Sequence, residues 1–124
     1  MERGVRLNLK KGIFALACIG IALLLFFILI EYNNPQTRGR VSLEKQLNTI
    51  IANHAVDQIK SLSQNEQTYQ FMARLSPTIQ CKRTSDIQGM NRDSEYYYVT
   101  TLDDRKVDVY VRKGDWKVTG IHLQ

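Results

Sequence analysis

The chain has few of the residues from which catalytic and metal sites are usually built. Its 124 residues include only two cysteines, two histidines and two prolines. Cys18 and Cys81 cannot supply a disulfide framework, and neither is spaced with a histidine as zinc ligands are. There is no glycine-rich phosphate-binding loop. The sequence therefore predicts no metal site, no cofactor and no enzyme activity.

The side chains that could carry chemistry each have a simpler explanation. His54 falls on the apolar side of a predicted helix, and His122 has no carboxylate or cysteine neighbour at ligand spacing. Cys81 is explained as a small buried hydrophobe, with an intermolecular thiol as the alternative. Asp103 and Asp104 together fit a tight turn. These residues do not combine into a pattern that predicts a reaction.

Charge is absent from one long stretch of the chain. Between Gly12 and Ile30 no side chain is charged, and none carries an amide or a hydroxyl group. At about 1.5 Å per residue, a helix of this length nearly matches a hydrocarbon core of roughly 30 Å. The sequence therefore predicts a transmembrane helix over residues 12–30. Its principal anchoring residues are Gly12, Ile13, Phe14, Leu23, Leu24, Leu25, Phe26, Phe27, Ile28, Leu29 and Ile30.

The flanks of this stretch favour an uncleaved anchor and indicate its orientation. A secretory signal usually has an apolar core of about 7–15 residues followed by a small-residue cleavage site, and this run is longer and lacks such a site. Lipidation at Cys18 is an alternative, but the apolar run continues well beyond that residue. Basic residues precede the span, whereas Glu31 follows it at once. The positive-inside rule then places the N-terminus in the cytoplasm and the C-terminal domain outside it, across an inner, cytoplasmic-type membrane crossed once.

The charge beyond the span is nearly balanced. From Glu31 onward there are thirteen basic and eleven acidic residues. Proteins that bind nucleic acid concentrate positive charge in a patch or stripe, so we expect no nucleic-acid partner. The basic residues before the span suit anionic headgroups. The expected partners are membrane lipid and other membrane or envelope proteins, and the oligomeric state stays open.

Four segments follow from these patterns. They are a basic cytoplasmic tail (1–11), the transmembrane helix (12–30), a polar linker (31–41) and a small extracytoplasmic α+β domain (42–124). The linker contains proline and glycine, which are typical of connections between folded parts. The domain is near the lower size limit for an unassisted hydrophobic core, so help from a partner is expected.

A long helix is predicted from Ser42 to about Leu75. Ser42 is a suitable N-cap, and apolar positions recur after it at helical spacing. Ser63 and Glu66 form a capping-box pattern, which predicts a kink or a restart there. Pro77 ends the helix, because proline disfavours helical backbone at the residue before it. The apolar stripe consists of Leu43, Leu47, Ile50, Ile51, His54, Ile59 and Leu62.

From Thr78 onward the sequence predicts strands. A short strand is expected at residues 79–82 and a loop at 85–94, followed by three strands joined by turns at Asp103-Asp104 and Lys113-Gly114. A bulge is expected near Gly120, and it would let Ile121 or Leu123 turn inward. The fold class is α+β, with the long helix packed on a sheet of three to four antiparallel strands. The turns predict the opposed pairs Thr100–Val107, Tyr98–Val109, Tyr96–Val111, Val111–Trp116 and Val109–Val118.

This pairing separates the strand residues into two faces. One face is expected to pack on the helix, and its candidate core or pocket residues are Tyr96, Tyr98, Val109 and Trp116. The other face is expected to carry the candidate interaction residues Tyr97, Val99, Tyr110 and Ile121. Tyrosine is enriched at interfaces, although it is also common in ordinary strands. Trp116 is expected in the core near Ile50; a surface position would make it a candidate partner-binding anchor instead.

The stretch from Val107 to Leu123 carries a resemblance to known families. It reads as a strand, a glycine turn and then Trp-Lys-Val. With the basic tail, the membrane helix and the linker before it, the chain resembles membrane-anchored cystatin-like and NTF2-like periplasmic modules. It is also similar to small anchored respiratory-assembly domains of the cytochrome oxidase assembly type. This resemblance implies a scaffold or assembly subunit of an envelope complex.

Functions of different classes are compatible with these features. The first is a single-pass accessory or scaffold subunit whose outer domain docks onto partners in an envelope or inner-membrane complex. The second is a membrane-anchored module that binds or senses a small ligand between the helix and the sheet. A third assigns the function to the membrane helix, in which small residues offer a side for another helix. These small residues are Ala15, Ala17, Gly20 and Ala22.

Overall fold

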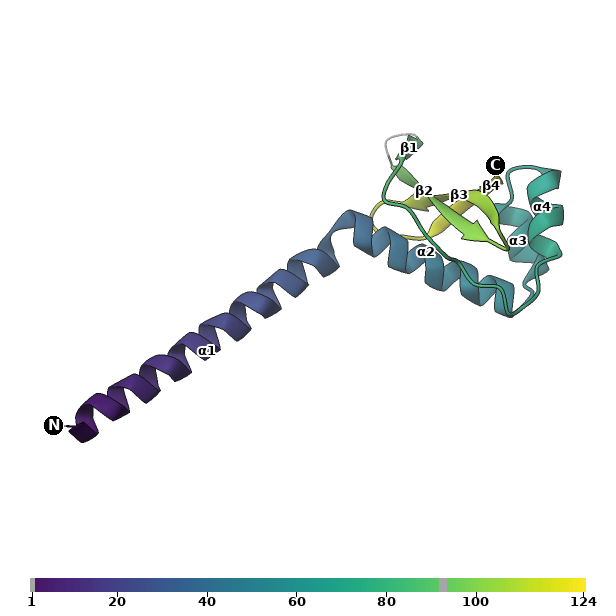
Figure 1. Cartoon of the computed structure of the whole chain (residues 1–124). Coiled ribbons are helices and arrows are strands. Elements are labelled where there is room, and N and C mark those ends of the chain that lie inside the picture. Colours follow the sequence, from purple (N-terminus) through teal and green to yellow (C-terminus); the bar gives the residue numbers. More distant parts are fainter. Residues whose placement is uncertain (1, 92–93) are drawn as a thin grey trace. The chain divides into compact units, whose positions relative to one another are not determined.

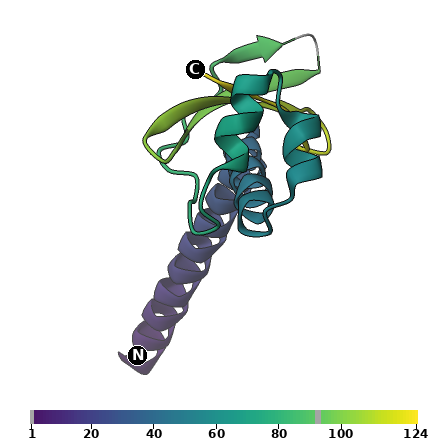
Figure 2. The same cartoon turned by 90° about the vertical axis from the view of Figure 1, so that its right-hand side faces the viewer.

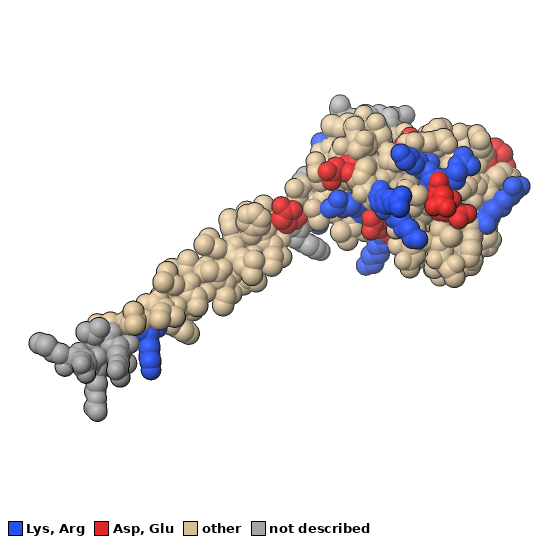
Figure 3. All heavy atoms as spheres, in the orientation of Figure 1, with Lys and Arg blue, Asp and Glu red and all other residues tan. Residues whose placement is uncertain are grey.

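The computed structural model describes residues 2–91 and 94–124 and divides into two compact units, residues 1–34 and 35–124. The first unit is helix α1 (Glu2–Asn33). Within it, the stretch from Asn8 to Glu31 is long and apolar enough to cross a membrane. Its middle is uncharged (Figure 3). Met1 and the side chains of residues 2–7 lie outside the described part, so the predicted basic tail can be followed only from Asn8.

The apolar part of α1 exposes its side chains. None of its most apolar window is buried, and the Phe14 side chain is 72% exposed. So much apolar surface in water is unfavourable, because each Å² of it costs about 25 cal/mol. A membrane anchor and a signal sequence both account for such a helix.

Helix α2 (Pro35–Ala52) opens the second unit, and the predicted helix start at Ser42 is wrong. Most of the predicted linker belongs to α2. Pro35 takes the first helical position, where a missing backbone N–H is tolerated because the helix leaves it unpaired anyway. Ser42 lies inside the helix, and its hydroxyl donates to the Trp116 carbonyl at 2.7 Å.

The predicted long helix is divided into three. Helix α2 ends at Ala52, and His54 adopts a left-handed backbone (φ 47°) in the turn before α3 (Val56–Leu62). His54 is exposed, so its predicted place on the apolar stripe is wrong. The buried members of the stripe are Leu43, Leu47, Ile50, Ile51 and Ile59.

Helix α4 (Glu66–Ala73) begins with a different cap from the predicted one. The Asn65 side-chain oxygen accepts a hydrogen bond from the Thr68 backbone N–H at 2.8 Å. The Ser63 hydroxyl instead donates to the Ile59 carbonyl at 2.6 Å, at the end of α3. The Ser63–Glu66 capping box is therefore wrong, because Ser63 completes the helix before it and leaves Asn65 to start the next one.

Four antiparallel strands form one sheet in the order β1-β2-β3-β4. The strand predicted at residues 79–82 does not form; the segment is irregular, and only its last residue, Lys82, makes an isolated bridge, to Thr101. The first strand instead lies in the predicted loop. The strands are β1 (Gly89–Asn91), β2 (Glu95–Leu102), β3 (Arg105–Arg112) and β4 (Val118–Leu123).

The two hairpins differ in how well the sequence predicts them. In the β2–β3 hairpin, Asp103 and Asp104 are both left-handed (φ 48° and 63°), as a two-residue hairpin turn requires, and Tyr98 pairs with Val109 as predicted. In the β3–β4 connection the predicted register is wrong, because Val111 pairs with Val118 rather than with Trp116. The loop therefore extends beyond the Lys113-Gly114 pair.

A register shift lies near the predicted bulge. The pairing changes between Tyr110, which lies opposite Gly120, and Val111, which lies opposite Val118. Ile121 then lies opposite Val109 on the buried face. The prediction of an irregularity at Gly120 is confirmed by this shift.

One hydrophobic cluster contains buried side chains of the helices and of one sheet face. Its sheet members include Tyr98, Val107, Val109 and Ile121, all completely buried. Helices α2, α3 and α4 gather on one side of the sheet (Figures 1 and 2). Within the second unit, none of these three helices covers the opposite side, which we call the outer face.

Candidate functional site

The outer face of the sheet carries two tyrosines that touch. Tyr97 of β2 lies opposite Tyr110 of β3, and their ring centroids are 5.8 Å apart. Val99 follows on the same face of β2, because side chains two residues apart in a strand share a face. All three residues are half-buried. The prediction that Ile121 joins them is wrong, since the register shift turns it into the core, where it is 0% exposed.

A hollow of about 550 Å³ adjoins Val99. Two cations, Arg83 and Lys106, belong to its lining, which includes no acidic residue. The nearest acid by strand register is Asp108, opposite Val99, and its carboxylate accepts a hydrogen bond from the Gln124 side-chain amide at 2.7 Å. We call this the basic hollow; the rest of its lining is Ser85, Gln88, Thr101 and Gln124.

An irregular segment positions Arg83 beside β2. Its neighbour Lys82 exchanges two backbone hydrogen bonds with Thr101, and the Ser85 N–H donates to the Val99 carbonyl at 2.8 Å. The Ser85 hydroxyl accepts from the Val99 N–H at 2.9 Å. Arg83 itself has a left-handed backbone (φ 53°). The segment thus lies along β2, but its sequence lacks the alternation of apolar and polar residues that is typical of a strand.

A second cluster lies where the β3–β4 loop meets the start of α2. Trp116 stacks on Tyr96, with 6.3 Å between ring centroids and 12° between ring planes. The Arg38 guanidinium lies 5.8 Å from the Trp116 ring, and the Lys113 Nζ atom lies 4.7 Å from the Tyr96 ring. These four residues form what we call the aromatic–cation cluster.

The loop that carries Trp116 is fixed to α2 by side-chain hydrogen bonds. The Gln46 amide nitrogen donates to the Trp116 carbonyl at 2.8 Å, and the Gln46 amide oxygen accepts from the Val118 N–H at 2.9 Å. Ser42 donates to the same Trp116 carbonyl. The predicted place of Trp116 opposite Val111 is wrong, because the longer loop holds it before β4. Trp116 still packs against the hydrophobic cluster, where it is half-buried.

Two other arginines near this cluster are already paired. The Arg112 Nε donates to the Asp115 carboxylate at 3.2 Å, and this guanidinium holds the pKa of Asp115 down at about 2. Arg40 lies 3.4 Å from Asp86. Within residues 2–91 and 94–124, neither Arg38 nor Lys113 forms an ion pair. The cluster therefore presents two cations without a neutralising carboxylate.

The remaining candidate pocket residues belong to the packed core. Tyr98 and Val109 are completely buried, so neither is open to a ligand. Burial raises the pKa of Tyr98 to about 12. Cys81 is half-buried, its backbone N–H donates to the Asn48 side-chain oxygen at 2.8 Å, and burial raises the pKa of its thiol to about 11. A thiol that stays protonated is a poor nucleophile at neutral pH.

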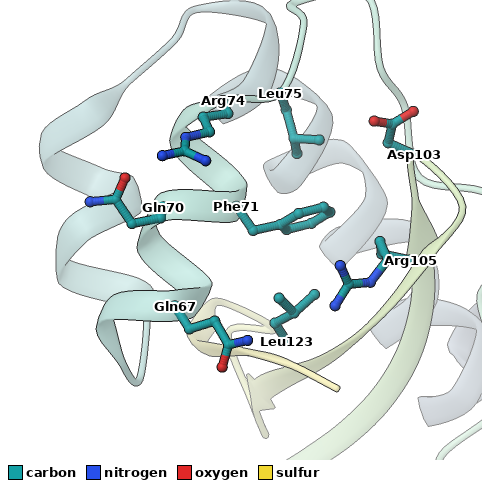
Figure 4. Close-up of a pocket in the computed structure, with 8 residues that line it drawn as sticks. All are labelled: Gln67, Gln70, Phe71, Arg74, Leu75, Asp103, Arg105 and Leu123. Carbon is teal, nitrogen blue, oxygen red and sulfur yellow. The ribbon is translucent and has the colours of Figure 1, made fainter.

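Figure 4 shows another hollow, of about 410 Å³, between α4 and the β2–β3 hairpin. Phe71 points into it between Leu75 and Leu123, and the Arg105 guanidinium lies 5.7 Å from the Phe71 ring. Its lining comes from separate segments of the chain, so no local sequence pattern indicates it. The remaining lining residues are Gln67, Gln70, Arg74 and Asp103.

No protein-family model matches the chain, and no curated protein or solved structure is significantly similar to it. The resemblance to cystatin-like and NTF2-like modules therefore rests on the pattern from Val107 to Leu123. Within the described ranges, no three His, Cys, Asp or Glu residues gather as metal ligands would. The geometry thus provides surfaces suited to binding: the tyrosine pair with the basic hollow, the aromatic–cation cluster, and the hollow around Phe71.

Proposed function

We propose that the chain is a single-pass membrane protein that acts as an accessory or scaffold subunit. In this proposal, residues 35–124 lie outside the cytoplasm and dock onto an acidic segment of another membrane or envelope protein. The docking surface is the outer face around Tyr97, Val99 and Tyr110, together with the basic hollow.

The observation that carries the proposal is the tyrosine pair beside the basic hollow. The two rings lie 5.8 Å apart on the outer face, which none of α2, α3 and α4 covers. Tyrosine offers a large contact area with few rotatable bonds, which suits the centre of an interface. Arg83 and Lys106 make the adjoining hollow positive, and complementary charge selects an acidic partner.

The anchoring part of the proposal is supported by α1. Its apolar stretch is long enough for one crossing, and Lys10 and Lys11 precede the uncharged part while Glu31 follows it. The positive-inside rule then favours a cytoplasmic N-terminus. A chain anchored in this way should stay in the membrane fraction after alkaline extraction.

Photocrosslinking from the outer face tests the docking surface in native membranes. The full chain with p-benzoylphenylalanine in place of Val99 is expected to give a discrete adduct with a different protein. The same substitution at Gln58, an exposed residue of α3, is the matched control and should not give that adduct. No adduct from Val99 would contradict the docking surface.

Charge reversal tests the chemistry of the partner. Arg83→Glu combined with Lys106→Glu should abolish the Val99 adduct, because the reversed hollow repels an acidic segment. Lys60→Glu, at an exposed position of α3, should leave the adduct unchanged. An adduct that survives the double reversal, or one formed between two copies of the chain, would overturn the proposal.

The hollow around Phe71 supports a second candidate function, the binding of a small amphipathic anion. Its volume of about 410 Å³ lies within the range of roughly 300–1,000 Å³ that is usual for ligand sites. Phe71 and Leu75 supply an apolar floor, and Arg74 and Arg105 supply cations. Phenylacetate should then raise the thermal midpoint of the reconstituted chain, and Arg105→Gln should remove the effect. An unchanged midpoint in the unmodified chain would reject this candidate.

A further inference from the structure

The aromatic–cation cluster combines the residue types that lie at membrane–water interfaces. Trp and Tyr rings favour the headgroup level because they are amphipathic, and Lys and Arg bind anionic headgroups. In this cluster the Trp116 and Tyr96 rings stack on each other, with Arg38 against one ring and Lys113 against the other. The two cations are exposed and the two rings are half-buried, so all four remain accessible.

The two cations are available for an anion. Arg40 and Arg112 are paired with Asp86 and Asp115, whereas Arg38 has no ion pair among the described residues. Arg38 lies near the start of α2, whose first turn contains no acidic residue. The N-terminal end of a helix carries partial positive charge, so a cation there is repelled. A phosphate group bound at this place would relieve that repulsion.

The length of the chain keeps the cluster close to a membrane. The apolar stretch ends at Glu31, and Arg38 follows after 38 − 31 = 7 residues. Even a fully extended chain of that length spans at most about 25 Å. This limit holds for any arrangement of the two units. It makes a lipid surface, which is present wherever α1 is inserted, the expected occupant.

The backbone of the β3–β4 loop is strained at Trp116. Trp116 is left-handed (φ 57°), a backbone conformation that is strained for a residue other than glycine. Hydrogen bonds from Gln46 and Ser42 to its carbonyl hold it in place. Strained residues of this kind are concentrated at binding and catalytic sites.

We propose that the aromatic–cation cluster is a lipid-contact face. Arg38 and Lys113 bind the phosphates of anionic phospholipids, and Trp116 and Tyr96 lie at the level of the headgroups. This inference rests on the membrane anchoring proposed above and is independent of the protein partner at the outer face.

Trp116 is the only tryptophan in the chain, so its fluorescence reports on this cluster alone. The full chain is reconstituted into vesicles of phosphatidylcholine, with or without phosphatidylglycerol. Spin-labelled lipids carry the quencher either at the headgroup or deep in the acyl chain. The headgroup label should quench Trp116 more than the deep label, and phosphatidylglycerol should increase the quenching. High salt should reverse that increase, because it screens exposed charges.

Arg38→Gln combined with Lys113→Gln should reduce the lipid-bound population. Each basic residue close to an anionic surface contributes a factor of about five, so the two changes lower the bound-to-free ratio about 25-fold. Arg83→Gln combined with Lys106→Gln removes the same charge from the basic hollow and is the matched control. It should leave the quenching unchanged.

Three results would overturn the lipid-contact face. Quenching could be independent of phosphatidylglycerol, or it could be as strong from the deep label as from the headgroup label. Trp116 could also stay as accessible to an aqueous quencher in vesicles with phosphatidylglycerol as in detergent micelles, in which case no lipid covers the cluster. Flotation with the vesicles is measured first, since a chain that does not float would overturn the anchoring and this inference with it.

Discussion

Gly39 of α2 lies directly against the ring of Tyr98, in the centre of the sheet. A Cβ atom on Gly39 would collide with the Tyr98 hydroxyl and would lie 2.9 Å from its Cε2 atom. The Tyr98 side chain is 0% exposed, so the surrounding core holds the ring in place. This close approach joins the first turns of α2 to the core, and it explains why a segment with the composition of a linker is part of the folded unit.

Gly39→Ala should destabilise the second unit, although alanine favours a helix by about 1 kcal/mol over glycine. Overpacking of a core costs about 1–3 kcal/mol or more, and here the added methyl group meets a ring that cannot move. We expect a clear fall in the thermal midpoint of the full chain, which near-ultraviolet circular dichroism measures. Gly20→Ala is the control, because nothing lies within 4 Å of a Cβ atom there. Equal midpoints for the two variants would contradict the contact.

Thr68→Val should destabilise the fold by about 1–3 kcal/mol, the usual cost of leaving a buried polar group unpaired. The Thr68 hydroxyl is completely buried, donates to the Asn65 side chain at 2.7 Å and accepts from the Leu123 N–H at 2.9 Å. Valine keeps the shape but leaves that N–H without its partner. Thr49→Val is the control, since Thr49 is exposed and bonds within its own helix. Denaturant unfolding of both variants measures the difference.

The sequence predicts the helices and strands best where two local signals agree. In the β2–β3 hairpin the Asp103-Asp104 turn and the alternation of the strands specify one register, and that register is present. Between α2 and α3 no such agreement exists. The apolar positions continue at helical spacing past His54, while the break depends on one left-handed residue. Strand β1 is short and exposes Met90, so alternation cannot reveal it.

The candidate site is predictable only in part. Tyr97, Val99 and Tyr110 share a face by the period of two, but Arg83 reaches the same face through an irregular segment laid beside β2. The Trp116 loop is longer than its Lys113-Gly114 pair suggests. The Asp115 carboxylate accepts hydrogen bonds from the Arg112 side chain and from the Lys117 N–H, which stabilises the longer loop. Such side-chain bonds have no signature in hydrophobic patterning.

Alkaline pH should destabilise the second unit through Cys81. Burial raises the pKa of this thiol from 9.0 to about 11. The folded state therefore holds the proton more tightly than the unfolded state does. The contribution of this thiol to the free energy of unfolding is complete below about pH 9 and is lost as the pH rises to about 11. Two pKa units correspond to roughly 2–3 kcal/mol. The raised pKa of Tyr98 has the same sign and extends the loss to higher pH.

Cys81→Ala isolates the thiol contribution in this pH experiment. The variant lacks the sulfur atom at every pH, but its thermal midpoint should fall less steeply than that of the unmodified chain between about pH 9 and about pH 11. Parallel curves for the two proteins would mean that the Cys81 thiol has the same pKa in the folded and unfolded states, which would contradict the shift.

Gln46→Leu should loosen the β3–β4 loop and release Trp116. Gln46 is half-buried, and its side chain bonds both the Trp116 carbonyl and the Val118 N–H. Leucine is similar in size but makes neither bond, so we expect a loss of about 1–3 kcal/mol. The left-handed Trp116 then relaxes, and its emission should shift to longer wavelength as the ring leaves Tyr96. Gln58→Leu, at an exposed position of α3, should change neither stability nor emission. If Gln46→Leu changed neither the stability nor the emission wavelength, the hydrogen bonds from Gln46 would not be what holds the loop. Other contacts would then have to stabilise the left-handed backbone of Trp116.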